Sequence, residues 1–167
     1  AVPKNCYYQS EQAIVNVLNT YSNKGMASLK RFRFVNNFTP QLCSHWRDNE
    51  ALMLKMIYEN SDNIKYASER LKGEEEFIMA AMEKRGEALQ YVNESFKKNY
   101  NIVMAAVEQD GLALRHVDKS FLKDNPDIVL AAVKEDGDAL KYADESLKMN
   151  KKIVMAAVEQ DGLALRH

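Results

Sequence analysis

The chain has 167 residues, of which 46% are hydrophobic and 28% charged, a globular composition that argues against disorder over most of its length. Its net charge of −1 argues against nucleic-acid binding driven by overall charge, and no apolar run approaches the roughly 20 residues that span a bilayer. Cys6 and Cys43 are too few for a disulfide scaffold and lack the paired spacing of a zinc site, so we expect a cytoplasmic or other reducing compartment.

Residues 1–48 do not follow the repeat found in the rest of the chain. Ser10 to about Tyr21 places apolar side chains at helical spacing and has Gly25 beyond its end, which predicts a helix. We interpret residues 1–48 as a helical N-terminal cap or the remnant of a neighbouring domain. Residues 1–73 carry 10 Lys+Arg against 6 Asp+Glu (+4), and residues 74–167 carry 13 against 18 (−5), a polarity compatible with self-association.

Two short motifs in this first segment have a possible chemistry. Residues 30–34 (Lys-Arg-Phe-Arg-Phe) interleave basic and aromatic groups, as in phosphate contact with base stacking or at a membrane interface, but the run is too short to favour nucleic acid. Cys43 lies two residues before His45, yet neighbours in sequence seldom reach the geometry of a thiol and its base. An enzyme using Cys43 remains an alternative, and we expect no enzymatic activity.

A tandem repeat organises residues 49–167. Residues 102–116 recur unchanged as residues 153–167, an offset of 51 residues or two units. Residues 128–142 form the copy between them, residues 77–91 an earlier one, and a divergent copy begins near Asn49. The predicted units are 49–73, 74–98, 99–124, 125–149 and an incomplete 150–167.

Each unit is predicted to be a helix, a glycine stop and one or two further short helices. Asn125 and Pro126 are expected to cap and begin the main helix of one unit. Glycines are expected to end these helices in the left-handed conformation, at Gly86, Gly111, Gly137 and Gly162. A second set of caps recurs in register, at Ser68, Asn93, Asp118 and Asp144. Each precedes by three residues a large side chain expected to anchor in the stack: Leu71, Phe96, Phe121 or Leu147.

The fold class follows from the size of the unit. A unit of about 25 residues cannot bury its apolar face alone, so the units must stack into an all-α short α-solenoid or curved helical array. Alanine pairs once per unit would allow close helix approach, as at residues 105–106. A column of long apolar side chains is predicted to be core: Met53, Met79, Met104, Leu130 and Met155.

The pattern Ile-Val-x-Ala-Ala-Val-x-x-x-Gly-x-Ala-Leu-x-Tyr/His resembles a tandem helical-repeat family of unknown function. This resemblance covers residues 74–167 well and 49–73 weakly. It implies arrays of the kind present in large bacterial proteins, including effector-type proteins, and in some protist proteins, with delivery to a host cell as one possible setting. The resemblance carries no catalytic motif, and the absence of a continued last unit suggests a longer parent protein.

An aromatic or imidazole side chain recurs once per unit as a candidate partner-binding column: Tyr66, Tyr91, His116, Tyr142 and His167. Such a column can grip an extended peptide, or its members can pack between units. Acidic clusters before the glycines either meet a basic partner or are solvated helix ends, as at residues 108–110, 135–136 and 159–161. No phosphate loop or metal motif occurs, so we expect no cofactor and no metal site.

These observations favour a non-catalytic protein-interaction or scaffolding module, with a protein or peptide partner and nucleic acid unlikely. The alternative is a regulatory or targeting region of a larger enzyme, such as a secreted bacterial effector, whose catalytic residues lie outside this chain.

Overall fold

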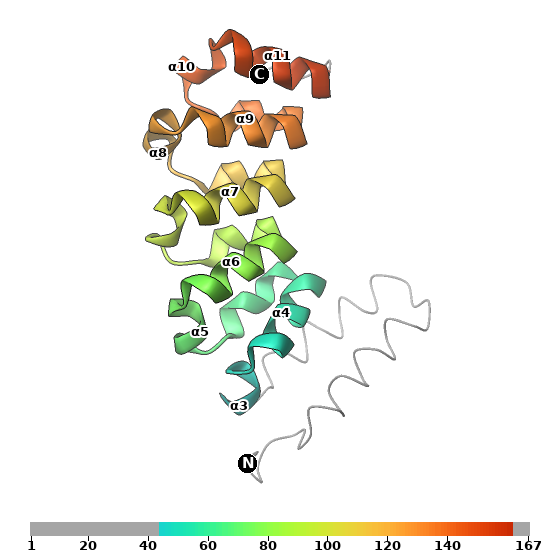
Figure 1. The fold of residues 1–167 in the computed structure, drawn as a ribbon, viewed down its shortest axis with the longest axis vertical. Helices are drawn as coiled ribbons and strands as arrows, with labels where there is room; N and C mark the ends of the chain where they lie inside the picture. The colour runs from blue at the N-terminus through green and yellow to red at the C-terminus, as the bar shows by residue number, and fades with distance from the viewer. Residues whose placement is uncertain (1–43, 162–167) are drawn as a thin grey trace, which may run out of the picture. The chain divides into compact units, whose positions relative to one another are not determined.

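The computed structural model describes residues 44–161, and every regular element in that range is a helix (Figure 1). The described residues fall into two compact units, divided after Phe77. The all-α prediction is confirmed. The predicted helix at residues 10–21, the motif at residues 30–34, Cys43, Gly162 and His167 lie outside the described residues, so the boundary between residues 48 and 49 stays a prediction.

The first unit contains α3 (Ser44–Arg47), α4 (Glu50–Glu59), the 3₁₀ helix η2 (Ser61–Tyr66) and α5 (Glu69–Gly73). Asn49 begins α4 because its side chain accepts a hydrogen bond from the Leu52 amide at 2.9 Å. The core of this unit consists of fully or almost fully buried apolar side chains: Trp46, Leu52, Met53, Met56, Ile57, Ile64, Ala67, Leu71 and Phe77.

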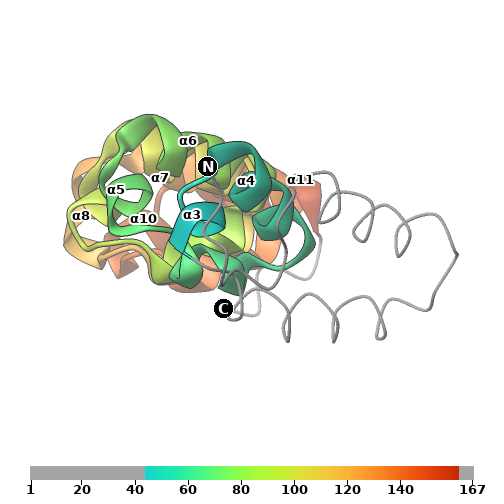
Figure 2. The ribbon, with the colours of Figure 1, turned by 90° about the horizontal axis from the view of Figure 1, so that it is seen from below.

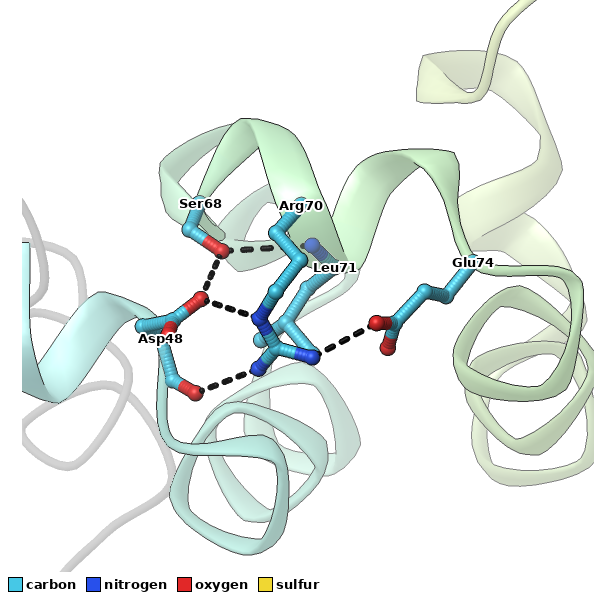
Figure 3. A network of polar contacts seen from close by, with 5 residues as sticks. All are labelled: Asp48, Ser68, Arg70, Leu71 and Glu74. Carbon is cyan, nitrogen blue, oxygen red and sulfur yellow. Dashed lines mark hydrogen bonds and ion pairs between the residues drawn. The ribbon is translucent and has the colours of Figure 1, made fainter.

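A polar network joins the segment before α4 to the start of α5 (Figure 3). Ser68 caps α5 by accepting from the Leu71 amide at 3.2 Å, and its hydroxyl donates to Asp48 Oδ1 at 2.5 Å. Arg70 donates from Nε to the same Asp48 oxygen at 2.9 Å and from Nη1 to Glu74 at 2.6 Å. The pKa of Asp48 is therefore lowered, first by the Ser68 hydrogen bond and then by Arg70. This network holds two segments 20 residues apart in sequence.

The helix α6 (Glu75–Lys84) crosses the division between the units, and the second unit repeats one set of elements after it. A ten-residue α-helix alternates with a six-residue 3₁₀ helix and a short helix. The elements are η3 (Gly86–Tyr91), η4 (Phe96–Lys98), α7 (Tyr100–Gln109), η5 (Gly111–His116), α8 (Lys119–Asp124), α9 (Pro126–Glu135), η6 (Gly137–Tyr142), α10 (Glu145–Lys148) and α11 (Lys151–Gln160).

Equivalent elements of successive repeats pack on each other in the second unit. The long helices contact in the order α7, α9, α11, and the 3₁₀ helices in the order η3, η5, η6. The short helices α8 and α10 lie together on one side (Figures 1 and 2). In α9 the buried stripe is Ile128, Val129, Ala132 and Val133, each with no exposed surface. Burial of one such valine or isoleucine contributes about 1.5–3 kcal/mol, which makes stacking the main source of stability.

The repeated glycine has a different role from the predicted one. Gly86, Gly111 and Gly137 have no positive φ, and each is the first residue of a 3₁₀ helix rather than a left-handed helix stop. A Cβ on Gly111 would lie 2.5 Å from the carbonyl oxygen of Ala132, and one on Gly137 2.7 Å from that of Ala157. The glycine is therefore required because its backbone touches the long helix of the next repeat.

Two predicted side-chain caps are not formed. Asn125 occupies the N-cap position of α9 and Pro126 begins that helix, as predicted, but the Asn125 side chain donates to Phe121 O at 2.8 Å instead of accepting from an amide of α9. Asn93 begins a turn before η4, and no side-chain cap is formed there. The caps at Ser68, Asp118 and Asp144 are confirmed.

The burial of two predicted columns varies along the chain. Met53 is fully buried, but Met79, Met104 and Leu130 are half-buried and Met155 is 50% exposed, so the predicted apolar core column is wrong in the second unit. In the second unit this column lies beside the buried stripe, at the outer edge of each ten-residue helix. Among the predicted anchors, Leu71 and Leu147 are buried, whereas Phe96 and Phe121 are only half-buried and Leu122 is the buried residue of α8.

Candidate functional site

The 3₁₀ helices position the predicted aromatic column. Tyr91, His116 and Tyr142 are the last residues of η3, η5 and η6, which contact each other in that order. The structure therefore places these three side chains at equivalent positions of adjacent repeats in the second unit. Tyr66 ends η2 in the first unit, and His167 lies outside the described residues.

All three side chains of this row are half-buried. The alanine and leucine two or three positions earlier in each 3₁₀ helix are the core residues, as Ala113 and Leu114 in η5 show with at most 1% exposure. The aromatic or imidazole ring is held at the rim of the stack, where one part packs and another meets solvent. Half-burial of these rings is compatible with both interpretations that the sequence left open, packing between units and contact with a partner.

Basic side chains accompany two members of the row. Arg115 Nε donates to His116 Nε2 at 2.8 Å, and the Lys141 ammonium lies 5.1 Å from the centroid of the Tyr142 ring. Arg115 also lies 3.5 Å from Glu87. Burial lowers the pKa of His116, and the charges of Arg115 and Lys97 lower it further, which agrees with a neutral imidazole accepting at Nε2. The row thus offers flat rings, cations and hydrogen-bonding groups, which are the kinds of group that can contact a peptide.

The acidic residues before the glycines have a structural role that the sequence analysis missed. Asp110 and Asp136 cap the next 3₁₀ helix, because each accepts from the backbone amide two residues later, at 3.0 and 2.9 Å. A glutamine at the position before this acidic residue can join two repeats. Gln160, which precedes Asp161, accepts a hydrogen bond from the Gly137 amide of the preceding repeat at 2.7 Å. Gln109 accepts likewise from Gly86. The cap replaces the unfavourable contact of an acid with a helix C-terminus by a favourable one with a helix N-terminus.

A groove between α7 and α9 was not predicted. It has a volume of about 320 Å³, and it is lined by Glu108, Asp127, Leu130, Ala131, Lys134 and Glu135. A smaller groove of about 190 Å³ continues between α9 and α11, where Leu130 and Asp127 again contribute. Leu130 was predicted to be core, because apolar spacing cannot tell a buried position from one at the helix edge. The charged residues one turn before and after Leu130, Asp127 and Lys134, were a sequence signal for an exposed edge that could have identified the groove.

A third cleft, of about 340 Å³, is polar and lies at the C-terminal ends of the long helices. It is lined by Arg85, Glu87, Gln109, Asp110, Gly111, Glu135 and Asp136. Within residues 44–161, no group of three or more His, Cys, Asp and Glu side chains is arranged to hold a metal ion. None of the helices in that range combines the length and the apolar composition that spanning a membrane requires. His45 stacks edge-on against Trp46 at 4.8 Å between ring centroids.

Comparison with known proteins gives one family. The model of the family described as "Domain of unknown function (DUF4116)" matches residues 49–92, 74–122 and 125–167. These three matches follow one another along the repeats. No curated protein sequence and no solved structure matches the chain.

Proposed function

From the premise that the chain belongs to this family of domains of unknown function, we propose that it is a non-catalytic protein-interaction module. In the proposal, the second unit holds an extended peptide along Tyr91, His116 and Tyr142.

The observation that carries the proposal is the recurrence of one half-exposed ring at the same place in three stacked repeats. Rings on a rigid scaffold bury area at a low cost in conformational entropy, which makes tyrosine common among the residues that dominate binding. Arg115 and Lys141 beside the rings supply donors for backbone carbonyls or acidic groups of a peptide. Stacked helices lie roughly 8–10 Å apart, so about every third residue of an extended peptide would meet one ring.

The test is selection of short peptides from a random displayed library against the whole chain, followed by affinity measurement. The triple variant Tyr91→Ala, His116→Ala, Tyr142→Ala should bind the selected peptides at least about tenfold more weakly, because its rings are the proposed contacts. Tyr58→Ala is the matched control, since Tyr58 is 57% exposed but belongs to α4 in the first unit. Circular dichroism checks that each variant folds, and Tyr142→Ser alone replaces the triple variant if that one unfolds. Equal binding by wild type and the ring variant, or a library that yields no binder, contradicts the proposal.

A further inference from the structure

We propose that the groove between α7 and α9 is a second docking surface, for a peptide segment that carries an apolar side chain between two basic ones. This groove shares no residue with the row formed by Tyr91, His116 and Tyr142. The inference therefore goes beyond the proposed function, and either can fail alone.

The floor of the groove is apolar and its two ends are set by parallel helices. Leu130 and Ala131 form the middle, and both are half-buried, so part of each faces the groove. At one end the Tyr100 hydroxyl donates to Asp127, which joins the N-terminal turns of α7 and α9. At the other end Glu108 and Glu135 belong to the last turns of the same two helices. An apolar floor is thus bounded by carboxylates at both ends.

The charge of the walls selects the partner. Three carboxylates, Asp127, Glu108 and Glu135, face one cation, Lys134, so the lining has a net charge of −2. All four of these side chains are exposed, and at the end formed by Glu108 and Glu135 the last turns of both helices add the negative end of their dipoles. Tyr100 is 40% exposed at the Asp127 end, where its ring can meet a cation. An anionic or purely apolar segment would leave the net negative charge of the lining uncompensated, whereas a basic segment would neutralise it.

The spacing of the carboxylates sets the spacing of the peptide. Asp127 and Glu135 are eight residues apart on one helix, which corresponds to roughly 12 Å along its axis. Side chains four residues apart in an extended peptide are separated by about 13 Å and point to the same side as the one between them. A basic-x-apolar-x-basic segment therefore presents both cations to the ends of the groove and its apolar side chain to Leu130.

The probe for the test is the synthetic peptide Gly-Arg-Ser-Leu-Ser-Arg-Gly, titrated into the isotopically labelled full chain. NMR chemical shifts are suitable because they register weak binding and show which residues respond. The expected result is saturable shifts at Leu130, Ala131 and Glu135. The isomer Gly-Leu-Ser-Arg-Arg-Ser-Gly should bind several-fold more weakly, because its composition is the same but its spacing is wrong.

The variants separate a defined groove from general charge attraction. Glu108→Gln should weaken binding about two- to fivefold, whereas Glu159→Gln should leave it unchanged. Glu159 is the matched control because it is exposed and occupies in α11 the repeat position that Glu108 occupies in α7, but it lines none of the described grooves. Equal effects of the two substitutions, equal binding of the isomer, or no saturable shift at the groove overturn the proposal.

Discussion

At the scale of single residues, the repeated glycine is a position where the second unit leaves no room for a side chain. A Cβ on Gly111 would lie only 2.5 Å from the Ala132 carbonyl oxygen. This oxygen and the glycine Cα that would carry the Cβ both belong to the backbone. Neither can move without shifting η5 or α9. Glycine is thus required at position 111 because there is no room for a side chain, and not because the backbone adopts an unusual conformation.

Gly111→Ala should therefore destabilise the protein by about 1–3 kcal/mol, the usual cost of overpacking. Gly73→Ala is the control, because nothing lies within 4 Å of a Cβ there and alanine is the better helix former. Urea unfolding of the two variants measures the difference. Equal free energies of unfolding for Gly111→Ala and the wild type would show that the contact between repeats is loose.

His116 should make stability depend on pH. Its pKa is lowered from the ordinary value of 6.5 by burial and by Arg115 and Lys97. Between the folded and unfolded pKa values the unfolded chain binds more protons, so the contribution of this residue is complete above about 6.5 and is lost as pH falls through the folded pKa. His116→Tyr, which introduces the residue of the neighbouring repeats, should remove this contribution.

The measurement is the free energy of unfolding of wild type minus that of His116→Tyr at several pH values between 8 and 5. The difference should decline as pH falls below about 6.5. An NMR titration that places the pKa of His116 above its ordinary value would contradict the prediction.

At the scale of elements, one position decides how each 3₁₀ helix begins. Asn60, Asp110 and Asp136 occupy it in extended conformation, and each accepts from the amide two residues later. Arg85 occupies the same position before η3 and makes no side-chain cap. Its Nε is also buried without a hydrogen-bond partner. The start of η3 therefore lacks the side-chain cap that η2, η5 and η6 have.

Arg85→Asn should stabilise the protein by about 0.5–1 kcal/mol, because it supplies the cap that Asn60 supplies to η2. Asp110→Ala should act in the opposite direction by about 1 kcal/mol, since it removes an existing cap. Thermal and urea unfolding of the two variants measure whether each one is more or less stable than the wild type. A loss of stability in Arg85→Asn would mean that packing of the arginine stem outweighs the missing cap.

At the scale of the whole molecule, stability should fall along the second unit. The helix α9 packs on both α7 and α11 and has four fully buried residues. In α11 only Ile153 and Ala157 are buried, while Val154 and Val158 are half-buried. In arrays where each repeat contacts only its neighbours, a helix with less buried surface opens more readily.

Hydrogen exchange can compare two amides in matched surroundings. Ala132 and Ala157 both follow an alanine in the same position of the repeat, so their intrinsic exchange rates are nearly equal. The Ala157 amide should exchange at least about tenfold faster than that of Ala132, given the smaller apolar burial around α11. Equal protection of the two amides would mean that the second unit opens only as a whole.

Several features were predictable because they depend on interactions within a single repeat. Apolar spacing identified the long helices, and Ser68, Asp118 and Asp144 were recognised as caps from their own side chains. The prediction failed at Gly111 and at Leu130, whose surroundings come from the following or preceding repeat. It also failed for the side chain of Asn125, which donates to Phe121 O instead of capping α9.

The sequence by itself determined the length of the repeat, the all-helical class and the family, since periodicity and capping are local properties of the chain. Only the tertiary structure decided which repeated residues are spacers, caps or surface. That choice depends on contacts between residues about 23 to 27 positions apart, such as Gly137 with Gln160 and Tyr100 with Asp127. Residues with the same periodicity can face the core, the next repeat or solvent, and stacking alone assigns them.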